Sequence, residues 1–399
     1  MRSATQTTER SLDRVEQWIE TNDFKGYEPF DGLTSFLYPL TLKNRLASQV
    51  LQQAVRRFPL NLRPLLGVRP LDSTKGRGYV AWGYLKRYQA AGDAAYRDKA
   101  LSCLDWLDKN KSSLYDDHSW GNHFPYASRS GYIYEQESTI VWTGLIGQVF
   151  LEAYALFGLP RHLEIIRSIA RWMAALPREE TKNGLCLSYI ARHQSSIHNS
   201  NMIGAAFLAG AAGVTGTGEY RSLARRAMEY SCARQSRDGA WYYGDHPMYH
   251  WVDVFHTGYN LDALKRYQHY SGDLSFSDSL RRGYEYFRRR FFEPSGRVRY
   301  YHDRTRPIDI QCASQAMDTL LLFSTEDHDA FASAERTALW SIHHMQSRDG
   351  HFYFRHYAPG IHNGAPMIHW GQATMYKSLA SLILRGRQKD VGPLPLSGR

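Results

Sequence analysis

Several features that would place a chain in a common class are absent from this sequence of 399 residues. Its four cysteines, Cys103, Cys186, Cys232 and Cys312, lie far apart, with neither a CxxC pair nor the spacing of a metal site. The zinc-protease pattern HExxH is missing as well. We therefore expect reduced, packed thiols, no bound metal and no cofactor.

Signals of export and of membrane insertion are also lacking. The N-terminal stretch MRSATQTTERSLDRVEQ has no apolar core, and no run of 18 apolar residues occurs anywhere. These absences predict a cytoplasmic protein without stable membrane insertion.

Acidic residues are the minority among the charges. The chain has 49 Lys and Arg against 39 Asp and Glu, a formal charge of +10. A basic surface favours anionic partners such as an acidic glycan, but it equally describes an ordinary solvated surface. The arginines are scattered over amphipathic segments without a recognisable nucleic-acid-binding motif, so we expect no nucleic-acid partner.

What the sequence does contain is a repeat with a period of about 54 to 65 residues. Six segments rich in Ala, Gly and Ser begin with polar and aromatic residues, and amphipathic segments with Arg, Glu and Asp on one face separate them. The six segments cover 73–91, 138–157, 198–213, 253–270, 309–323 and 369–384. Turn signals such as Asp-Gly and Asn-Gly stand in the loops that lead into several of them.

Crowded inner helices that alternate with amphipathic outer helices predict an all-α fold, an (α/α)6 toroid of six helical hairpins with short β-hairpin loops on the rim of a cavity. Residues 41–58 would supply the first outer helix. We expect residues 1–40 to form an extension with a cap helix, residues 41–386 the toroid, and residues 387–399 a flexible tail. The polar starts of the inner helices should then converge on one concave face.

Four residues near these starts are candidates for acid/base chemistry. Asp253 and His256 lie three apart, so both can face the same side of a first helical turn. A carboxylate among aromatic rings could act as a general acid or base, with Glu137 or Asp309 as a second carboxylate. Each has a plainer interpretation: Asp253 and Asp309 as helix caps, Glu137 as a first-turn residue, and His256 as a satisfied buried histidine.

Further polar and aromatic side chains near the helix starts are candidates for binding a saccharide, because ring faces stack on pyranoses and amides or imidazoles bind hydroxyl groups. They are Lys75, Trp142, His198, Asn199, Asn201, Trp241, Tyr243, Trp251, Tyr259, Gln311, Gln315, His369, Trp370 and Gln372. Lys75, Arg77 and Arg355 could also pair with a carboxylate or sulfate of an acidic sugar. Aromatic residues fill protein cores equally often, so no single ring decides the function.

Three motifs, Asp253–Tyr259, Asp238–Trp241 and Asp72–Gly76, give the chain a resemblance to the six-hairpin glycosidase superfamily. Within it, the chain looks most like members from bacterial polysaccharide-biosynthesis clusters, and it is also similar to the catalytic domain of glucuronyl C5-epimerases. The resemblance covers about residues 40–386 as an architecture. It implies an active site at the cavity mouth, with Asp253 as the position that matches best.

The predicted function is therefore that of a carbohydrate-active enzyme of polysaccharide or glycan biosynthesis, acting by acid/base chemistry on an acidic or hydroxyl-rich saccharide as a hydrolase, lyase or epimerase. One alternative is a non-catalytic glycan-binding or scaffold subunit of a polysaccharide synthesis complex. A second is a terpene-cyclase-like α-barrel protein, because the run Gln235–Trp241 is similar to the QW repeats of those enzymes, although no DDxxD motif is present.

Overall fold

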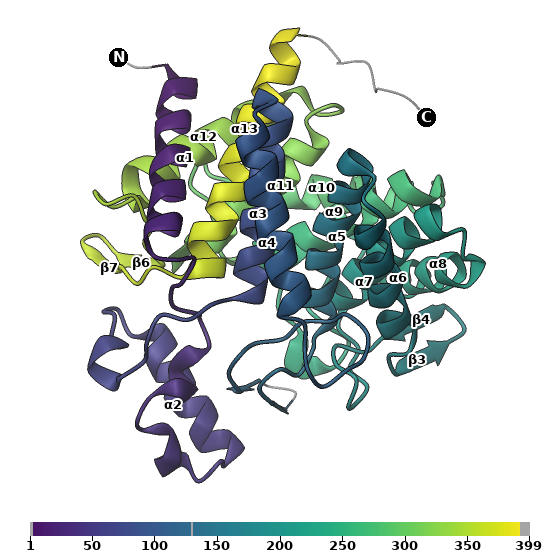
Figure 1. Ribbon diagram of the computed structural model, residues 1–399, viewed down its shortest axis with the longest axis horizontal. Coiled ribbons are helices and arrows are strands. Elements are labelled where there is room, and N and C mark those ends of the chain that lie inside the picture. Colours follow the sequence, from purple (N-terminus) through teal and green to yellow (C-terminus); the bar gives the residue numbers. More distant parts are fainter. Residues whose placement is uncertain (1–2, 129–130, 392–399) are drawn as a thin grey trace.

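The computed structural model describes residues 3–128 and 131–391, and it has the predicted all-α fold (Figure 1). The inner helices are α3 (Thr74–Ala91), α5 (Ile140–Phe157), α7 (His198–Thr215), α9 (Val254–Ser271), α11 (Ile310–Phe323) and α13 (Thr374–Val391). Each contacts the next, and α13 contacts α3, so the inner ring closes. The outer helices are α1 (Ala4–Thr21), α4 (Ala94–Lys109), α6 (Pro160–Ala174), α8 (Gly218–Ala233), α10 (Ser277–Phe291) and α12 (His328–Met345).

Small residues let the inner helices approach one another closely. Helix α7 is buried throughout its first 15 residues, His198–Ala212. A Cβ atom on Gly147 of α5 would lie only 2.5 Å from the ring of Phe207 on α7. A helix packed on both sides in this way has no room for a polar face, which explains why the inner segments carry few charges.

The sixth outer helix is α1, so the prediction that residues 41–58 fill this role is wrong. Helix α1 packs against α12 and α13. Equivalent glycines in three loops each pack against the backbone of an outer helix, and the third of these helices is α1. Gly239 contacts the Arg282 carbonyl of α10, Gly296 the Arg336 carbonyl of α12, and Gly350 the Arg14 carbonyl of α1. All three glycines have positive φ, and an added Cβ would lie within 2.5 Å of the carbonyl oxygen.

Helix α2 (Arg45–Arg57) instead packs on the turns η1 (Asp31–Thr34) and η2 (Tyr38–Thr41) and on strand β1 (Tyr126–Ala127). It projects from the ring beyond the ends of the inner helices (Figure 1). The predicted domain boundaries at residues 40 and 386 stay a prediction. Of the predicted tail, residues 387–391 belong to α13, and residues 392–399 lie outside the described part of the chain.

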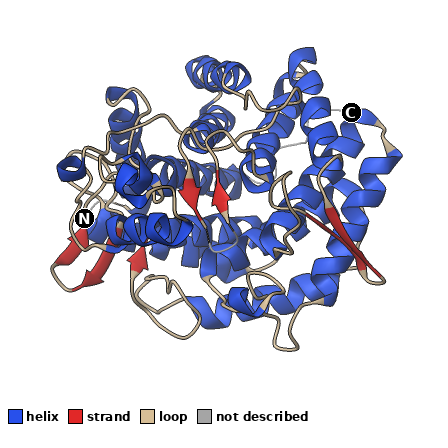
Figure 2. Cartoon of the chain, turned by 90° about the horizontal axis from the view of Figure 1, so that it is seen from below, coloured by secondary structure: helices blue, strands red, loops and turns tan. Residues whose placement is uncertain are grey.

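Short antiparallel strands stand among the loops, as Figure 2 shows from the α2 side. Strand β1 pairs with β2 (Tyr132–Ile133), and β3 (Arg178–Thr181) forms a regular hairpin with β4 (Gly184–Leu187). A three-stranded sheet has the order β5 (Ile308–Asp309), β6 (Arg355–Ala358) and β7 (Ile361–Asn363). The loops with Asp238-Gly239 and Ser295-Gly296 form tight turns without a named strand.

One helix, α5, has the length and apolar composition of a membrane span, but 72% of that window is buried inside the protein. It is an inner helix that contacts α3, α6 and α7. The apolar character of α5 is therefore accounted for by packing within the toroid.

Candidate active site

A cavity of about 830 Å³ lies where the inner helices begin. Side chains from α3, α5, α7 and α9, from the π-helical turn η5 (Ile368–Ala373) and from α2 line it. Of the residues predicted from the sequence, it brings together Lys75, Trp142, Asn199, Tyr243, Trp251, Asp253, His256, Tyr259, His369 and Trp370. The starts of α3, α5, α7 and α9 and the turn η5 thus meet at one cavity, whereas the described lining includes no residue from the start of α11.

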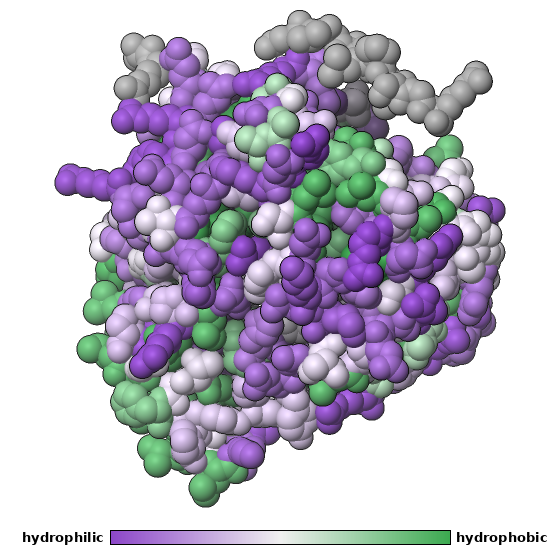
Figure 3. All heavy atoms as spheres, viewed as in Figure 1, coloured by the Kyte–Doolittle hydropathy of each residue, from purple (hydrophilic) through white to green (hydrophobic). Residues whose placement is uncertain are grey.

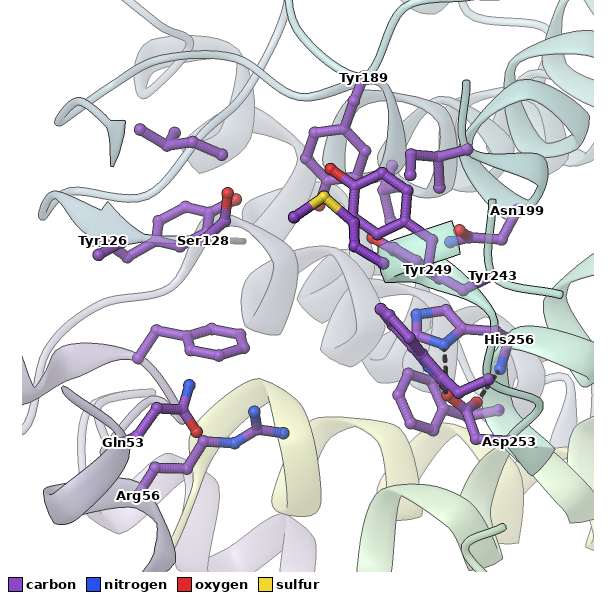
Figure 4. A pocket seen from close by; sticks show the side chains of 18 of the residues that line it. Gln53, Arg56, Tyr126, Ser128, Tyr189, Asn199, Tyr243, Tyr249, Asp253 and His256 are labelled. Atoms are coloured by element: carbon purple, nitrogen blue, oxygen red, sulfur yellow. Dashed lines mark hydrogen bonds and ion pairs between the residues drawn. The ribbon is translucent and has the colours of Figure 1, made fainter. Parts of the chain in front are cut away.

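Asp253 holds His256 in a fixed orientation at the start of α9. Asp253 is the N-cap, and its Oδ1 accepts the backbone N–H of His256 at 2.9 Å. Its Oδ2 accepts the Nδ1–H of His256 at 2.7 Å (Figure 4). The same oxygen accepts the indole N–H of Trp251 at 3.0 Å. Both carboxylate oxygens are thus engaged, and Nε2 is the His256 nitrogen left for a ligand.

A second imidazole is held in the same way. The Nδ1 of His369, on η5, pairs with Oε2 of Glu28, and both side chains are buried. Its Nε2 is buried, has no hydrogen-bond partner and belongs to a residue that lines the cavity. Burial lowers the pKa of His369, with a smaller lowering effect from Lys75, although the Glu28 carboxylate acts in the opposite direction. The lowered pKa favours the neutral ring, in which Nδ1 donates to Glu28 and Nε2 carries the lone pair.

The loop that supplies Glu28 is held by two sets of contacts. Arg63, in the segment that follows α2, forms a buried ion pair with Asp31 (2.8 Å) and also donates to the Glu28 carbonyl. In the second set, the Ile368 backbone N–H donates to the Tyr27 carbonyl. Because these contacts fix the loop against η5, the Glu28–His369 pair is preorganised.

Three cations that line the cavity, Lys75, Arg56 and the exposed Arg57, lack an ion pair with any described residue. Lys75, on α3, lies over the rings of Trp142 (5.0 Å) and Tyr259 (5.6 Å). Burial lowers its pKa to about 8, although the Glu28 carboxylate partly opposes this shift. Arg56, on α2, lies over Phe30 at 4.7 Å. Burial also lowers the pKa of Arg56, and its Nε has no hydrogen-bond partner.

The cavity lining carries a surplus of positive charge. Among the described lining residues, the cations are Arg56, Arg57, Lys75 and Arg304, and Asp253 is the one carboxylate. Arg56 and Gln53 of α2 lie across the cavity from Asp253 and His256 (Figure 4). Further buried polar atoms without a partner are Nε1 of Trp142 and Oδ1 of Asn199. Unsatisfied buried polar groups destabilise a protein, so their convergence on a cavity indicates a polar ligand that satisfies them.

Aromatic rings cover much of the remaining wall. They include Phe30, Tyr126, Tyr189, Tyr243, Tyr249, Trp251, Phe255, Tyr300 and Trp370. Tyr243 stacks on Trp251 with ring centroids 4.6 Å apart. Rings beside unsatisfied donors and acceptors are the combination that binds sugars, whose faces are apolar and whose edges are polar.

Two predicted carboxylates do not line the cavity. Glu137 is buried, accepts the hydroxyl of Tyr115 at 2.7 Å and pairs with Arg192. Asp309 caps α11 and accepts N–H groups of Gln311, Trp370 and Arg355. These contacts give both residues a structural role, and neither lines the cavity together with Asp253.

Other predicted binding residues also lie outside the cavity lining. His198 has both ring nitrogens engaged, with Asp245 at 2.9 Å and Ser231 at 3.4 Å. Asn201, Trp241 and Gln372 hydrogen-bond to backbone atoms of neighbouring segments.

Gln311 and Gln315 lie at two different places near the ring axis. The side-chain amide of Gln311 donates to the hydroxyl of Tyr259, which lines the cavity. Gln315 donates to Asp262 in a separate, smaller pocket of about 30 Å³. Of the cations suggested for an acidic sugar, Lys75 lines the cavity, whereas Arg77 pairs with Asp72 and Arg355 with Asp309.

Sequence reasoning missed Glu28 and Arg56. Glu28 lies in a loop without a repeat signal and is 341 residues from His369 in the sequence. Arg56 was missed because residues 41–58 were interpreted as an outer helix, which would point its arginines at solvent. Within the described residues, no group of three or more His, Cys, Asp and Glu could hold a metal ion.

No protein-family model and no curated protein matches this sequence. Solved structures do resemble it. A cellobiose 2-epimerase from Spirochaeta thermophila superposes with a TM-score of 0.61 at 11% identity, over 89% of this chain and 99% of that one. A D-mannose isomerase gives 0.57 at 13% identity, over 79% and 87%. A polysaccharide lyase gives 0.60 at 10% identity, over 98% and 99%.

These matches show that the chain shares the (α/α)6 toroid fold of the matched proteins. At these identities the likeness shows the (α/α)6 toroid alone. The three matched proteins are named for three different reactions, so the reaction of this chain must be argued from its own cavity.

Proposed function

We propose that this chain is an enzyme that moves protons at a carbon atom of an anionic saccharide, as an epimerase of uronic-acid residues does. One observation carries the proposal. Two imidazoles, His256 and His369, each have Nδ1 bound to a buried carboxylate and Nε2 left for a ligand in one cavity. This is the arrangement of a general acid and a general base.

The chemistry needs no external oxidant or reductant. In a uronate, the hydrogen on the carbon beside the carboxylate can leave as a proton to one imidazole, and the electron pair of the C–H bond passes into the carboxylate. The other imidazole, protonated, returns a proton to the opposite face, which inverts the carbon. Lys75 and Arg56 would stabilise the added negative charge. If the substituent on the next carbon left instead, the same first step would give a lyase product.

Glycoside hydrolysis fits the cavity less well. That reaction needs two carboxyl groups on either side of the bond. The described lining holds one, Asp253, with both oxygens already engaged.

An isoprenoid cyclase would suit the aromatic wall of the cavity. Its cationic intermediates, however, would be repelled by Lys75 and Arg56. The matched structures include epimerases, an isomerase and a lyase, which supports proton transfer on a saccharide, but also an α-mannanase, so their names do not separate this reaction from hydrolysis. Association with a polysaccharide synthesis complex and a cytoplasmic location stay predictions.

Deuterium exchange tests the proposal. The protein is incubated in deuterium oxide with a glucuronate-containing oligosaccharide and with the matched glucose-containing one, and nuclear magnetic resonance records deuterium at each sugar carbon. We expect exchange at the carbon next to the carboxylate in the acidic sugar, and a rate about 10² to 10⁴ times lower in His256→Asn and His369→Asn. His198→Asn is the matched control, because His198 pairs with a carboxylate outside the cavity lining.

Exchange that persists in both cavity variants would contradict the assignment of the two bases. Saccharide binding without exchange would favour the alternative of a non-catalytic glycan-binding subunit.

A further inference from the structure

The segment between Asp31 and Asp72 is unusual in composition, because its 40 residues contain no Asp or Glu. Asp and Glu make up 39 of the 399 residues, so a stretch of this length would on average hold about four. The same segment holds six cations: Lys43, Arg45, Arg56, Arg57, Arg63 and Arg69. Arg63 is buried in its pair with Asp31, and Arg56 lines the cavity. The other four are exposed and form no ion pair with a described residue.

Exposed apolar side chains are concentrated on the same segment. Half of the large hydrophobic residues that are exposed in the described chain lie here, in a tenth of its length. They are Phe36, Leu40, Leu42, Leu46, Val50, Phe58, Leu60 and Leu65, and Leu42 reaches 87% exposure. Figure 3 shows apolar spheres gathered at the lower left, where Figure 1 places α2. We call these eight residues, with Lys43, Arg45, Arg57 and Arg69, the basic apolar patch.

The patch adjoins the mouth of the cavity. Leu46 and Val50 belong to the patch and also line the cavity, as does Arg57. The patch stands on the α2 projection, outside the packed ring, so its apolar side chains have no role in the core (Figure 1). An exposed apolar surface of this kind marks a binding face.

Charge decides which partner fits. A second copy of the chain would bring four unpaired cations against four others, and like charges repel. An anionic glycan would pair with the cations but leave leucine side chains in water, and aliphatic tips lack the flat faces that stack on sugars. An anionic bilayer satisfies both sets: the apolar side chains enter the boundary between headgroups and acyl chains, and the cations pair with lipid phosphates.

We propose that the basic apolar patch binds the surface of an anionic membrane and holds the cavity mouth against it, without a membrane span. Taken together with the proposed function, on which this last step rests, the substrate is then an acidic saccharide carried on a lipid. A cavity that opens beside the bilayer would receive a sugar attached to a lipid headgroup.

Vesicle flotation with the full chain tests the patch. The vesicles consist of phosphatidylcholine alone or with about one third phosphatidylglycerol, a composition that models an anionic leaflet. We expect binding to the anionic vesicles only, weakened by salt. The double variant Leu40→Ser/Leu42→Ser, neither residue of which lines the cavity, should bind at least about tenfold more weakly. Leu274→Ser is the matched control, since Leu274 is 68% exposed outside the patch.

Three results would overturn the proposal: no flotation of the wild type with anionic vesicles, equal loss in the Leu274→Ser control, or a dimer in sedimentation velocity that the patch variant converts to a monomer. The proposed function is tested separately, because Leu40→Ser/Leu42→Ser should keep the wild-type exchange rate on a short soluble saccharide. Loss of vesicle binding with that rate unchanged would identify a surface role. Deuterium exchange without any vesicle binding would support the proposed function and contradict the proposal that the patch binds a membrane.

Discussion

The cavity and the smaller pocket each hold charged residues, and the two groups differ in whether a carboxylate pairs with the buried cation. In the smaller pocket, the buried Lys377 pairs with Asp318 at 2.8 Å. Nearby, Lys86 and the indole N–H of Trp82 both bind Glu152. In the cavity, Lys75 is as buried as Lys377 and Arg56 is half-buried, but neither forms an ion pair with a described carboxylate. A buried cation with its carboxylate is part of the fold, whereas one without it indicates a site for an anionic ligand.

The hydroxyl groups of Tyr79 and Tyr259, 3.3 Å apart, lie between the two groups. Tyr259 lines both spaces, and Tyr79 lines the smaller pocket. The comparison therefore separates residues on the same few helices into those that stabilise the ring and those that act on a ligand. Removing a cation that is paired with a carboxylate should lower stability without a specific effect on activity. Removing an unpaired cation of the cavity should lower activity without a loss of stability.

The largest expected effect is on catalysis and concerns the carboxylates that orient the imidazoles. Asp253→Asn keeps a good helix cap but replaces the carboxylate that accepts the Nδ1–H of His256 with an uncharged amide, so the imidazole loses the contact that orients it. We expect turnover to fall about 10²- to 10⁴-fold, and similarly in Glu28→Gln. The deuterium-exchange rate measures it, with Asp245→Asn, at the carboxylate partner of His198, as control. Unchanged turnover in these variants would contradict the proposal that Asp253 and Glu28 orient catalytic imidazoles.

On the paired side, Lys377→Met should destabilise the fold without a specific effect on turnover per folded molecule. It leaves Asp318 buried without its cation, a change that costs about 3–5 kcal/mol. Urea denaturation followed by circular dichroism gives the loss. Adding Asp318→Leu should restore most of the stability, and failure of this rescue would mean that the pair is not the cause.

Among the unpaired cations of the cavity, Lys75→Met should raise stability and lower turnover. Burial lowers the pKa of Lys75 from 10.5 to about 8, which corresponds to a penalty of at most about 3 kcal/mol on the charged form. Below about pH 8 the folded protein bears this cost in full. It disappears as the pH rises from about 8 to 10.5, where the unfolded chain still binds the proton.

Lys75→Met should therefore be more stable than the wild type at pH 7, with the gap closing toward pH 10, and should turn over its substrate much more slowly. Denaturation across this pH range provides the measurement. If the wild type were more stable than Lys75→Met at pH 7, the cost of burying the Lys75 charge would be offset by contacts within the protein.

The smallest expected effect is on substrate affinity. Arg56→Gln removes the guanidinium that faces Asp253 and His256 across the cavity (Figure 4). We expect KM for an acidic saccharide to rise about tenfold, with little change in kcat or in KM for the matched neutral saccharide. The exposed Arg237→Gln serves as control. Equal effects on both saccharides would mean that Arg56 does not select for charge.

Much of the architecture could be predicted because it repeats. The inner segments at 253–270 and 309–323 could be predicted from small residues that follow a capping Asp. In the structure, α9 and α11 begin directly after Asp253 and Asp309. Closure of the ring could not be assigned in this way, because α1 and α2 are both amphipathic. The sixth outer helix is identified only by tertiary contacts, those of α1 with α12 and α13 and that of Gly350 with Arg14 of α1.

For the candidate site, the sequence alone determined that polar and aromatic residues gather where the inner helices begin, because periodicity places those residues at the same end of each helix. Only the tertiary structure decided which of them face the cavity and which are satisfied elsewhere. His198 and His369 look alike in the sequence, yet His198 has both nitrogens bound and His369 keeps one free. The physical reason is that satisfaction of a buried polar group depends on partners far away in the chain, such as Glu28 for His369, and a local pattern holds no information about them.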